Sequence, residues 1–378
     1  MTNSYTQVTA VLIAVTVFVV GNGLLLMLIP LSGVQHGFSE ISIGMIGSAF
    51  FGGMFIGCAL CPRIIGRTGH IRAFSAFASG ATIAALLFPV FLHPIAWILL
   101  RIAMGICVAG MYATLEGWIQ DKAENLTRGR LMATYAVVQY IGQITGQQAI
   151  RLAAPTEFIL FSLAAAWIAA SVLPLAFSRS DPPAPPPSPR LRLLWLYRIS
   201  PVAVTSAVVS GATSGTLWSL VPAYAAQHGF SAGQNATITS VLTLGAAIAQ
   251  WPVGRISDKI DRRLVLIATM GLSVILQAAL ILWRPTDSWT ICLLMLPIGS
   301  FTLTTYLLGS SHAGDKAGRE NMVEVASGML LLYTAGAICA PTISAAMMKW
   351  MFPEALFLHN AVLQAILLIF VAWRVVAR

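Results

Sequence analysis

Long apolar stretches separated by short polar segments run along the whole chain. Each stretch holds about 20 residues, the length that one helical crossing of a bilayer requires. The polar segments are too short to hold a soluble domain. The pattern therefore predicts an all-α membrane protein with twelve transmembrane helices. The expected helices lie near residues 8–31, 43–61, 73–92, 95–118, 131–149, 157–177, 201–225, 236–253, 264–283, 288–310, 322–346 and 356–376.

Composition supports residence in a membrane. Of the 378 residues, 57% are hydrophobic and only 9% are charged, and the mean hydropathy is +0.81. Water-soluble folds of this size carry far more charge. The first residues, M-T-N-S-Y-T-Q, include no base, so they lack the charged region of a secretory signal. We expect the first apolar stretch to be an uncleaved helix.

The basic residues predict how the chain is oriented. Of the 22 Lys and Arg residues, all but Arg101, Arg151, Arg284 and Lys349 fall in alternate loops on one side or in the C-terminal tail. Loops rich in Lys and Arg face the cytoplasm, so we expect both termini to be cytoplasmic. The net charge of +9 then reflects topology and contact with anionic membrane lipids, and not binding of nucleic acid.

The sequence contains an internal repeat. The pentapeptide Q-H-G-F-S occurs at residues 35–39 and again at 227–231, an offset of 192. The tripeptide D-K-A occurs at 121–123 and 315–317, an offset of 194. A repeat of this length predicts two parallel six-helix halves.

The boundaries of these halves follow from the centre of the chain. We predict a first half over residues 1–177, a cytoplasmic linker over 178–200 and a second half over 201–378. Six prolines within residues 182–189 favour an extended, stiff linker. The alternative is a ligand for a proline-reading domain.

One loop resembles the signature of a known family. Residues Gly254–Arg263 read G-R-I-S-D-K-I-D-R-R. This order resembles the loop G-x-x-x-D-(R/K)-x-G-R-(R/K) of the major facilitator superfamily, with Asp261 in place of the second glycine. The matching segment of the first half, residues 62–70, reads P-R-I-I-G-R-T-G-H, so that Gly66 replaces its aspartate.

The resemblance implies a secondary transporter that works by alternating access, with a cytoplasmic gate formed by these loops. In the second half, Asp258 would face the start of the fifth span. In the first half, Arg63 and Arg67 would face the start of the eleventh. The alternative is that the charges only anchor the loops to lipid headgroups. The expected gate residues are Arg63, Arg67, Arg128, Arg130, Asp258, Lys259, Arg262, Glu320 and Glu324.

Two charged residues lie well inside an apolar stretch, and both belong to the fourth. An ionisable group in a bilayer is costly and is a candidate for function. Arg101 begins R-I-A-M-G, which resembles a second family signature, and the resemblance implies proton coupling or contact with an anion. We expect Asn22 as its partner, or else satisfaction by backbone carbonyls alone. Glu116 is expected either to carry a proton or to pair with a loop arginine.

Polar residues recur at every fourth position in three other stretches, so each set shares one helix face. These faces are expected to look inward, since lipid cannot satisfy amides and hydroxyls. They either line a pathway or bond one helix to another. With Asn22, Arg101 and Glu116, the expected pathway residues are Tyr135, Gln139, Gln143, Gln147, Ser210, Ser214, Trp218, Thr302 and Tyr306.

Other chemistry is not indicated. The five cysteines lie in apolar stretches, and Cys58-x-x-Cys61 is interpreted as packing rather than as a metal or redox site. No histidine stands at catalytic or metal-ligand spacing from a carboxylate, and no Walker loop or dinucleotide fingerprint occurs. We therefore expect no enzyme activity, no cofactor and no metal.

The sequence favours a proton-coupled exporter of a small organic molecule, an antiporter, acting as a monomer in the inner membrane of a bacterium. Its fifth stretch ends G-Q-I-T-G-Q-Q and lacks the P-G-G typical of antiporters. An importing proton symporter or facilitator for a polar or anionic solute is therefore the alternative. A membrane sensor or scaffold that binds without transporting is an alternative of another class.

Overall fold

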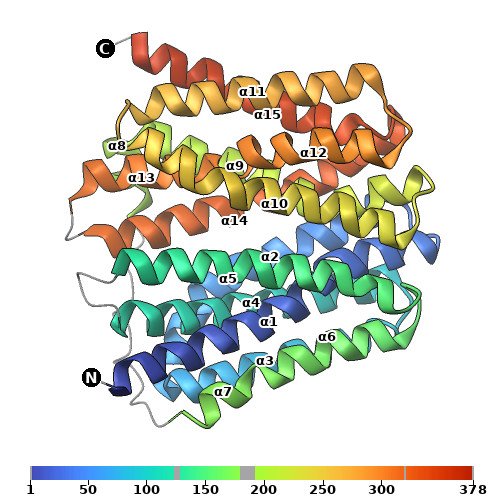
Figure 1. Cartoon of the computed structure of the whole chain (residues 1–378), viewed down its shortest axis with the longest axis vertical. Coiled ribbons are helices and arrows are strands. Elements are labelled where there is room, and N and C mark those ends of the chain that lie inside the picture. The colour runs from blue at the N-terminus through green and yellow to red at the C-terminus, as the bar shows by residue number, and fades with distance from the viewer. Residues whose placement is uncertain (1, 123–127, 179–191, 319–320, 377–378) are drawn as a thin grey trace. The chain divides into compact units, whose positions relative to one another are not determined.

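The computed structural model describes residues 2–122, 128–178, 192–318 and 321–376. Within these ranges the chain is helical and no strand occurs, which confirms the all-α prediction. The helices, shown in Figure 1, are α1 (Thr2–Gln35), α2 (Glu40–Thr68), α3 (His70–Leu87), α4 (Pro94–Lys122), α5 (Arg128–Gln148), η1 (Ala149–Leu152), α6 (Phe158–Ala170), α7 (Val172–Ala176), α8 (Leu193–Ile199), α9 (Pro201–Gln227), α10 (Ala232–Ser257), α11 (Arg262–Trp283), α12 (Ser288–Thr302), α13 (Thr305–Ala317), α14 (Met322–Trp350) and α15 (Ala355–Val376).

Most of the expected stretches meet the requirements of a membrane span. In the described ranges, ten helices are long and apolar enough to cross a bilayer, and α8 with α9 makes an eleventh if this bent pair is one span. The helix α5 lies on the expected fifth stretch but is not among them. Its recurring glutamines make it the least apolar of the expected spans, so the count of twelve rests on this helix.

Several boundaries differ from the expected ones. The expected tenth stretch is two helices, because α12 ends at Thr302 and α13 begins at Thr305. The expected loop at residues 62–70 is almost entirely helical, since α2 continues to Thr68 through the apolar Ile64 and Ile65. The residue after the helix is Gly69, whose φ of 81° suits glycine and few other residues.

A short helix, α8, occupies the end of the expected linker. The prolines stop at Pro189, and the following apolar segment is free to form a helix. At Ser200 the chain bends by 116° into α9. The Ser200 hydroxyl accepts from the amide of Ala203, and Pro201 occupies the first turn, which together favour a new helix start.

The chain forms two compact units. Unit 1 comprises Met1–His36 and Gly52–Ser188, and unit 2 comprises Gly37–Phe51 and Pro189–Arg378. The helix α2 is shared, because its first half packs within unit 2. There the Ser48 hydroxyl lies 2.7 Å from the Thr342 hydroxyl on α14.

Glycines set the helix packing of unit 1. A side chain at Gly146 on α5 would collide with the Val20 carbonyl of α1. A side chain at Gly53 on α2 would likewise collide with the Ile102 carbonyl of α4. These backbones therefore approach directly, as small residues at a helix interface allow.

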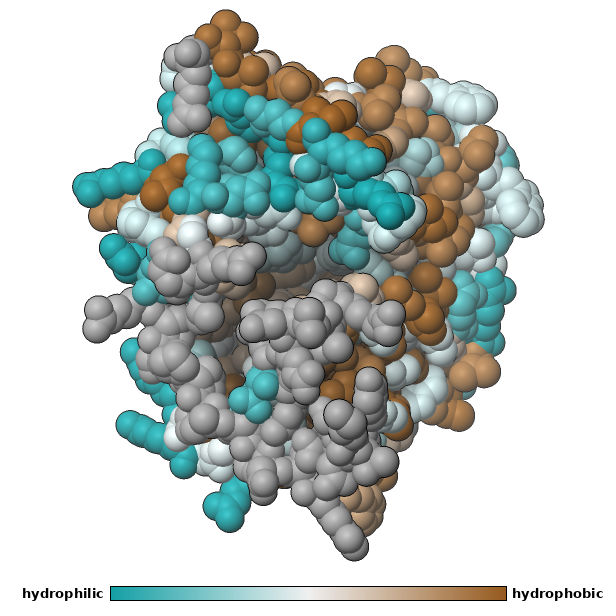
Figure 2. Space-filling model, turned by 60° about the vertical axis from the view of Figure 1, so that its left-hand side comes forward, coloured by the Kyte–Doolittle hydropathy of each residue, from teal (hydrophilic) through white to brown (hydrophobic). Residues whose placement is uncertain are grey.

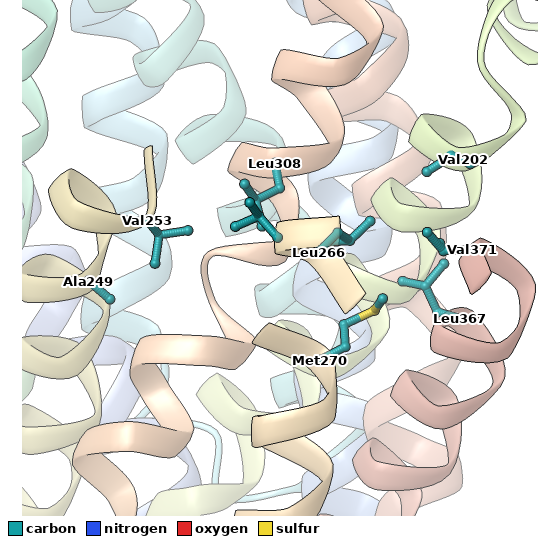
Figure 3. Packing of buried hydrophobic residues seen from close by; sticks show 9 residues of the cluster. Val202, Ala249, Val253, Leu266, Met270, Leu308, Leu367 and Val371 are labelled. Carbon is teal, nitrogen blue, oxygen red and sulfur yellow. The ribbon is translucent and has the colours of Figure 1, made fainter. Parts of the chain in front are cut away.

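Unit 2 also has glycines at which helix backbones approach directly, and it contains an apolar core. Side chains at Gly211 of α9 and Gly336 of α14 would collide with the facing backbone, so these two helices are in direct contact. Nearer the signature loop, a cluster drawn from α9, α10, α11, α13 and α15 fills the space between the helices (Figure 3). Its buried members are Val202, Ala249, Val253, Val265, Leu266, Met270, Leu308, Leu367 and Val371.

The exterior has the character of a membrane protein. In Figure 2, hydrophilic residues of the described ranges form a band across the upper part of the facing surface, and many hydrophobic residues lie toward the top and the right-hand edge. Large apolar side chains that would be unusual on a soluble protein are exposed, among them Trp251, Trp289 and Trp350. The Arg255 guanidinium lies 4.5 Å over the Trp251 ring, an arrangement suited to a membrane interface.

Candidate functional site

The two charged candidates of unit 1 lie on one continuous helix, α4, as expected. Arg101 is 2% exposed. Glu116 lies about four turns further along α4, roughly 22 Å away at 1.5 Å per residue. This distance is too long for an ion pair between Arg101 and Glu116.

Glu116 is held by tyrosine. The Tyr135 hydroxyl on α5 donates to Glu116 Oε1 at 2.9 Å, and Gln139 bonds the same hydroxyl. Tyr112 lies one turn before Glu116 on α4 and stacks edge-on against Phe18 of α1, with ring centroids 5.0 Å apart. Thus α4 and α5 bring three predicted pathway residues together around one carboxylate.

The remaining predicted residues of unit 1 lie along α1 and α5. Asn22 is 5% exposed and Gln147 is 1% exposed. Gln143 is half-buried, and its backbone packs against Gly23 of α1. The expected contact between Asn22 and Arg101 stays a prediction.

In unit 2, three helices bring polar side chains together. Ser214 on α9 hydrogen-bonds the hydroxyl of Tyr333 on α14. Tyr306 on α13 meets Tyr333 edge-on, with ring centroids 5.2 Å apart. Ser210 is fully buried one turn before Ser214, and Trp218 is half-buried one turn after it.

Thr302 lies in a separate network. Its hydroxyl is 2.7 Å from that of Ser273 on α11. The Gln277 side chain donates to the Ser273 hydroxyl at 3.0 Å and to the side-chain oxygen Oε1 of Gln364 on α15 at 2.8 Å. All four side chains are buried. This contact matches the alternative in which hydroxyls and amides join helices.

The signature loop is a compact cluster of charges. Arg262 Nε bonds Asp315 at 2.5 Å, and Arg262 Nη2 bonds Asp258 at 3.1 Å. Only residues 258–261 lie outside helices here, so the loop is shorter than expected. Asp258 and Lys259 are exposed.

Asp261 stands where the family pattern has glycine, and its contacts explain why it fits. Its carboxylate caps α11 by accepting from the Arg263 amide at 2.9 Å, and it pairs with the Arg263 side chain at 2.6 Å. Hydrogen bonds from Arg263 lower the pKa of Asp261 to about 2. The cap and the ion pair both favour the charged form.

The other gate residues are placed as follows. Arg63 and Arg67 are exposed near the end of α2. Glu324 lies 3.6 Å from Arg192, just before α8. Arg128 and Arg130 begin α5, but their side chains and all of Glu320 lie outside the described residues. The expected pairings of these groups across the loops stay predictions.

No histidine stands at catalytic or metal-ligand spacing from a carboxylate in the sequence, but His228 meets a distant carboxylate in the structure. Its Nε2 lies 3.3 Å from the buried Glu354, and the Arg284 Nε lies 4.0 Å from the same carboxylate. His228 and Glu354 are 126 residues apart, so sequence spacing could not reveal the pair. Within the described ranges, no group of three His, Cys, Asp or Glu side chains is placed to hold a metal ion.

Tyr112 and Tyr333 were also missed. The repeat could have found both, because the offset of 194 carries Tyr112 onto Tyr306 and Gln139 onto Tyr333. The two polar sites therefore occupy equivalent positions in the two halves of the sequence.

Comparison with known proteins gives a consistent result. The sequence model of the Major Facilitator Superfamily matches the chain twice, at residues 11–207 and 202–378. The uncharacterized MFS-type transporter YcaD of Escherichia fergusonii is 26% identical over 340 residues, which are 88% of this chain and 87% of that protein. YcaD of Shigella flexneri is 26% identical over 338 residues, with the same coverage.

Solved structures share the fold. The nucleoside transporter NupG superposes with a TM-score of 0.78 at 14% identity and covers 98% of both chains. The Escherichia coli fucose:proton symporter FucP superposes with a TM-score of 0.62 at 14% identity, covering 98% of this chain and 99% of its own.

Proposed function

Because the chain belongs to the Major Facilitator Superfamily, a family of membrane transporters and not of enzymes, we propose that it is a proton-coupled exporter of a small organic solute. Twelve spans in two six-helix halves, residues 1–177 and 201–378, would alternate access to a site between them. The bacterial source of its relatives and its loop charges support an inner-membrane location with cytoplasmic termini.

The observation that carries the proton coupling is the contact between Glu116 and Tyr135. A carboxyl group inside a membrane is expensive to keep charged and is retained where it binds protons or substrate. Tyr135 donates to the carboxylate, and the hydroxyl of Tyr135 is itself bonded by Gln139. Protonation of Glu116 would weaken the bond from Tyr135, because the bond is no longer assisted by the carboxylate charge, and α5 would respond to the proton.

Arg101 supplies the second half of the proposal. Its positive charge is buried on the same helix, away from Glu116. A buried guanidinium attracts carboxylate or phosphate groups and binds them in a bidentate manner. We therefore assign Arg101 to contact with an anionic or strongly polar part of the solute, and Glu116 to the proton.

An importing symporter is the second candidate. The end of α5, G-Q-I-T-G-Q-Q, lacks the P-G-G of antiporters. The neighbours NupG and FucP, by their names a nucleoside transporter and a fucose:proton symporter, handle polar solutes. The glutamines of α5 suit hydroxylated or heterocyclic solutes, which accept and donate hydrogen bonds.

One experiment separates these functions. A panel of metabolites and drugs is screened by thermal shift on the purified chain, since a ligand that binds only the folded state raises its stability. Each ligand found is then tested in proteoliposomes with an internal pH dye. An exporter exchanges solute against protons, whereas a symporter carries both inward. Ligand binding with no solute flux under any pH gradient contradicts transport and favours a sensor.

A further inference from the structure

The interface between α9 and α13 in unit 2 contains four buried polar atoms that have no hydrogen-bond partner among the described residues. They are the hydroxyls of Ser206, Ser210 and Thr305 and the Nε2 atom of His312. The hydroxyl residues are at most 1% exposed and His312 is 9% exposed. We call these four residues the polar seam.

The helix geometry places the seam along one line. Ser206 and Ser210 share a face of α9, and Thr305, Gly309 and His312 share a face of α13. The two faces meet, because a Cβ at Gly309 would lie 2.8 Å from the Ser206 Cβ. The helices run antiparallel there, since Ala203 and Ala207 of α9 pack with Ala313 and Ala317 of α13. The seam thus runs from His312, at the end nearer the signature loop, toward Ser210 and Thr305.

The repeat shows that the fold does not require a polar seam. Offsets of 192 and 194 carry the four positions onto Ala14, Phe18, Met111 and Trp118 of unit 1. The first three are apolar and fully buried. Trp118 packs edge-on against His70, with ring centroids 6.3 Å apart. The interface is therefore apolar at three of the four positions in unit 1, whereas all four positions carry hydrogen-bonding groups in unit 2. At the fourth position of unit 1, the Nε1 atom of Trp118 also lacks a partner among the described residues.

Energetics decide between a packing role and a hydrated one. A buried hydroxyl without a partner destabilises the fold, because the hydrogen bonds that it made with water in the unfolded chain are lost. Four such groups in one interface would be a large fraction of the stability of an ordinary domain. Internal water molecules relieve this cost, since each one bonds two to four polar groups. The polar seam provides such groups along two helix turns.

Charged groups lie near the seam at the end that holds His312. Asp315 and Lys316 on α13, with Asp261 and Arg263 at the start of α11, act electrostatically on its ring. The elements α8, α9 and α14 present apolar side chains to the same region of α13, including Leu196, Ala203 and Met329.

We propose that the polar seam holds a file of water molecules that gives protons access from the signature-loop end to the interior of unit 2, with His312 as the proton-binding group. The seam lies in a different unit from Glu116. Its test needs no substrate, so it stands or fails independently of the proposed function.

The first test measures water access with cysteine variants. The full-length chain with its native cysteines replaced receives Ser206→Cys or Ser210→Cys, and the reaction with N-ethylmaleimide is followed in native membranes. This reagent requires a thiol that water can ionise, so both variants should react at least about tenfold faster than Ala14→Cys, the repeat mate of Ser206. Equal rates for Ser206→Cys and Ala14→Cys overturn the hydrated seam.

The second test addresses His312 in the unmodified protein. Diethyl pyrocarbonate labels neutral imidazole that water reaches, and mass spectrometry of the peptides separates His312 from the buried His70. Labelling of His312 should follow a titration curve and should slow several-fold in Ser206→Val, which fills the seam. Labelling of His312 no faster than that of His70, or unchanged by Ser206→Val, removes His312 from the proposal.

Discussion

The helix α4 of unit 1 and its repeat mate in unit 2 differ in the chemistry that they carry. Arg101 and Glu116 lie on α4, and the offset of 194 carries them onto Met295 and Ser310. Met295 is fully buried, and the Ser310 hydroxyl donates to the Leu307 carbonyl of its own helix. The backbone differs as well, since α4 is continuous while α12 and α13 are separated at residues 303–304.

This difference indicates a division of labour. A pair of halves derived from one repeat could carry the same groups, yet the charges that lie well inside an expected span, away from its ends, are confined to the fourth. Unit 2 offers tyrosine, serine and amide groups at the matching level. Neutral groups orient a solute by hydrogen bonds, whereas a buried charge binds an ion or a proton. The signature loops differ in the same sense, because the Asp258, Arg262 and Asp315 cluster corresponds to Gly66, His70 and Asp121.

Replacing Arg101 should have the largest effect. Arg101→Met copies the residue of unit 2 and removes the charge while keeping an apolar chain. Truncating one partner of a buried charge pair costs about 2–5 kcal/mol, so with the proposed contact between Arg101 and the solute lost, transport should fall by at least about 30-fold. Flux of a ligand found by thermal shift is measured in proteoliposomes at equal protein content. Met295→Leu is the matched control, and wild-type flux in both Arg101→Met and Arg101→Lys would leave only a packing role.

The next largest effect is expected at the close-packing glycines. Gly142 and Gly336 are repeat mates, but their surroundings differ. A Cβ at Gly142 would lie 3.2 Å from the Thr16 carbonyl, whereas at Gly336 it would collide with the Val208 backbone. Gly336→Ala should therefore cost about 1–3 kcal/mol of folding free energy and Gly142→Ala clearly less. Thermal unfolding in detergent measures both, and equal losses would mean that α9 and α14 separate as easily as α1 and α5.

Glu116→Gln tests the proton directly. The amide keeps a bond with Tyr135 but takes up no proton. The pH dependence of net transport, up to about tenfold per pH unit for one proton, should disappear. Exchange of labelled solute across the membrane should continue. Ser310→Ala, at the mate position, should change neither quantity, and an unaltered pH profile in Glu116→Gln contradicts coupling through this residue.

The smallest effect is expected at the signature loop. Asp261→Asn keeps the cap of α11 but loses the ion pair with Arg263. Hydrogen bonds from Arg263 lower the pKa of Asp261 to about 2. The pair thus stabilises the folded state at pH values above the ordinary pKa of aspartate, and this contribution disappears as pH falls toward about 2.

Because the Asp261 side chain is 39% exposed, the contribution should stay below about 1 kcal/mol. Thermal unfolding of both proteins is compared at neutral pH and in acid. The difference between them should shrink in acid, and a difference that grows there would contradict the ion pair.

How much of this could be read from sequence depends on the range of the interaction. Apolar length predicted the helical fold, because the length of an apolar stretch is a local pattern. Helix periodicity placed Tyr135 and Gln139 on one face. It could not say that Tyr135 meets Glu116, since that contact joins two helices. For the same reason the pair of His228 with Glu354 had no signal in sequence.

Some misses were recoverable. A comparison of each position with its repeat mate would have singled out Tyr333 and the four residues of the polar seam. The break at residues 303–304 is different in kind. Pro297 lies within α12 and causes no break there, while Leu303 and Thr304 form no regular turn signal. The last residue of α12, Thr302, contacts Ser273 of α11, and such a contact between helices has no signal in the local sequence.

Backbone contact between α9 and α14 has a mechanical consequence. At Gly211 and Gly336 no side chain lies between the two helices, so sliding one past the other would force backbone atoms together. We expect the two helices to move together as one rigid body. The helix α13 is attached differently, with a two-residue gap at its start and a small contact at Gly309. We therefore expect strain in unit 2 to be taken up by a tilt of α13 and not by sliding of α9 along α14.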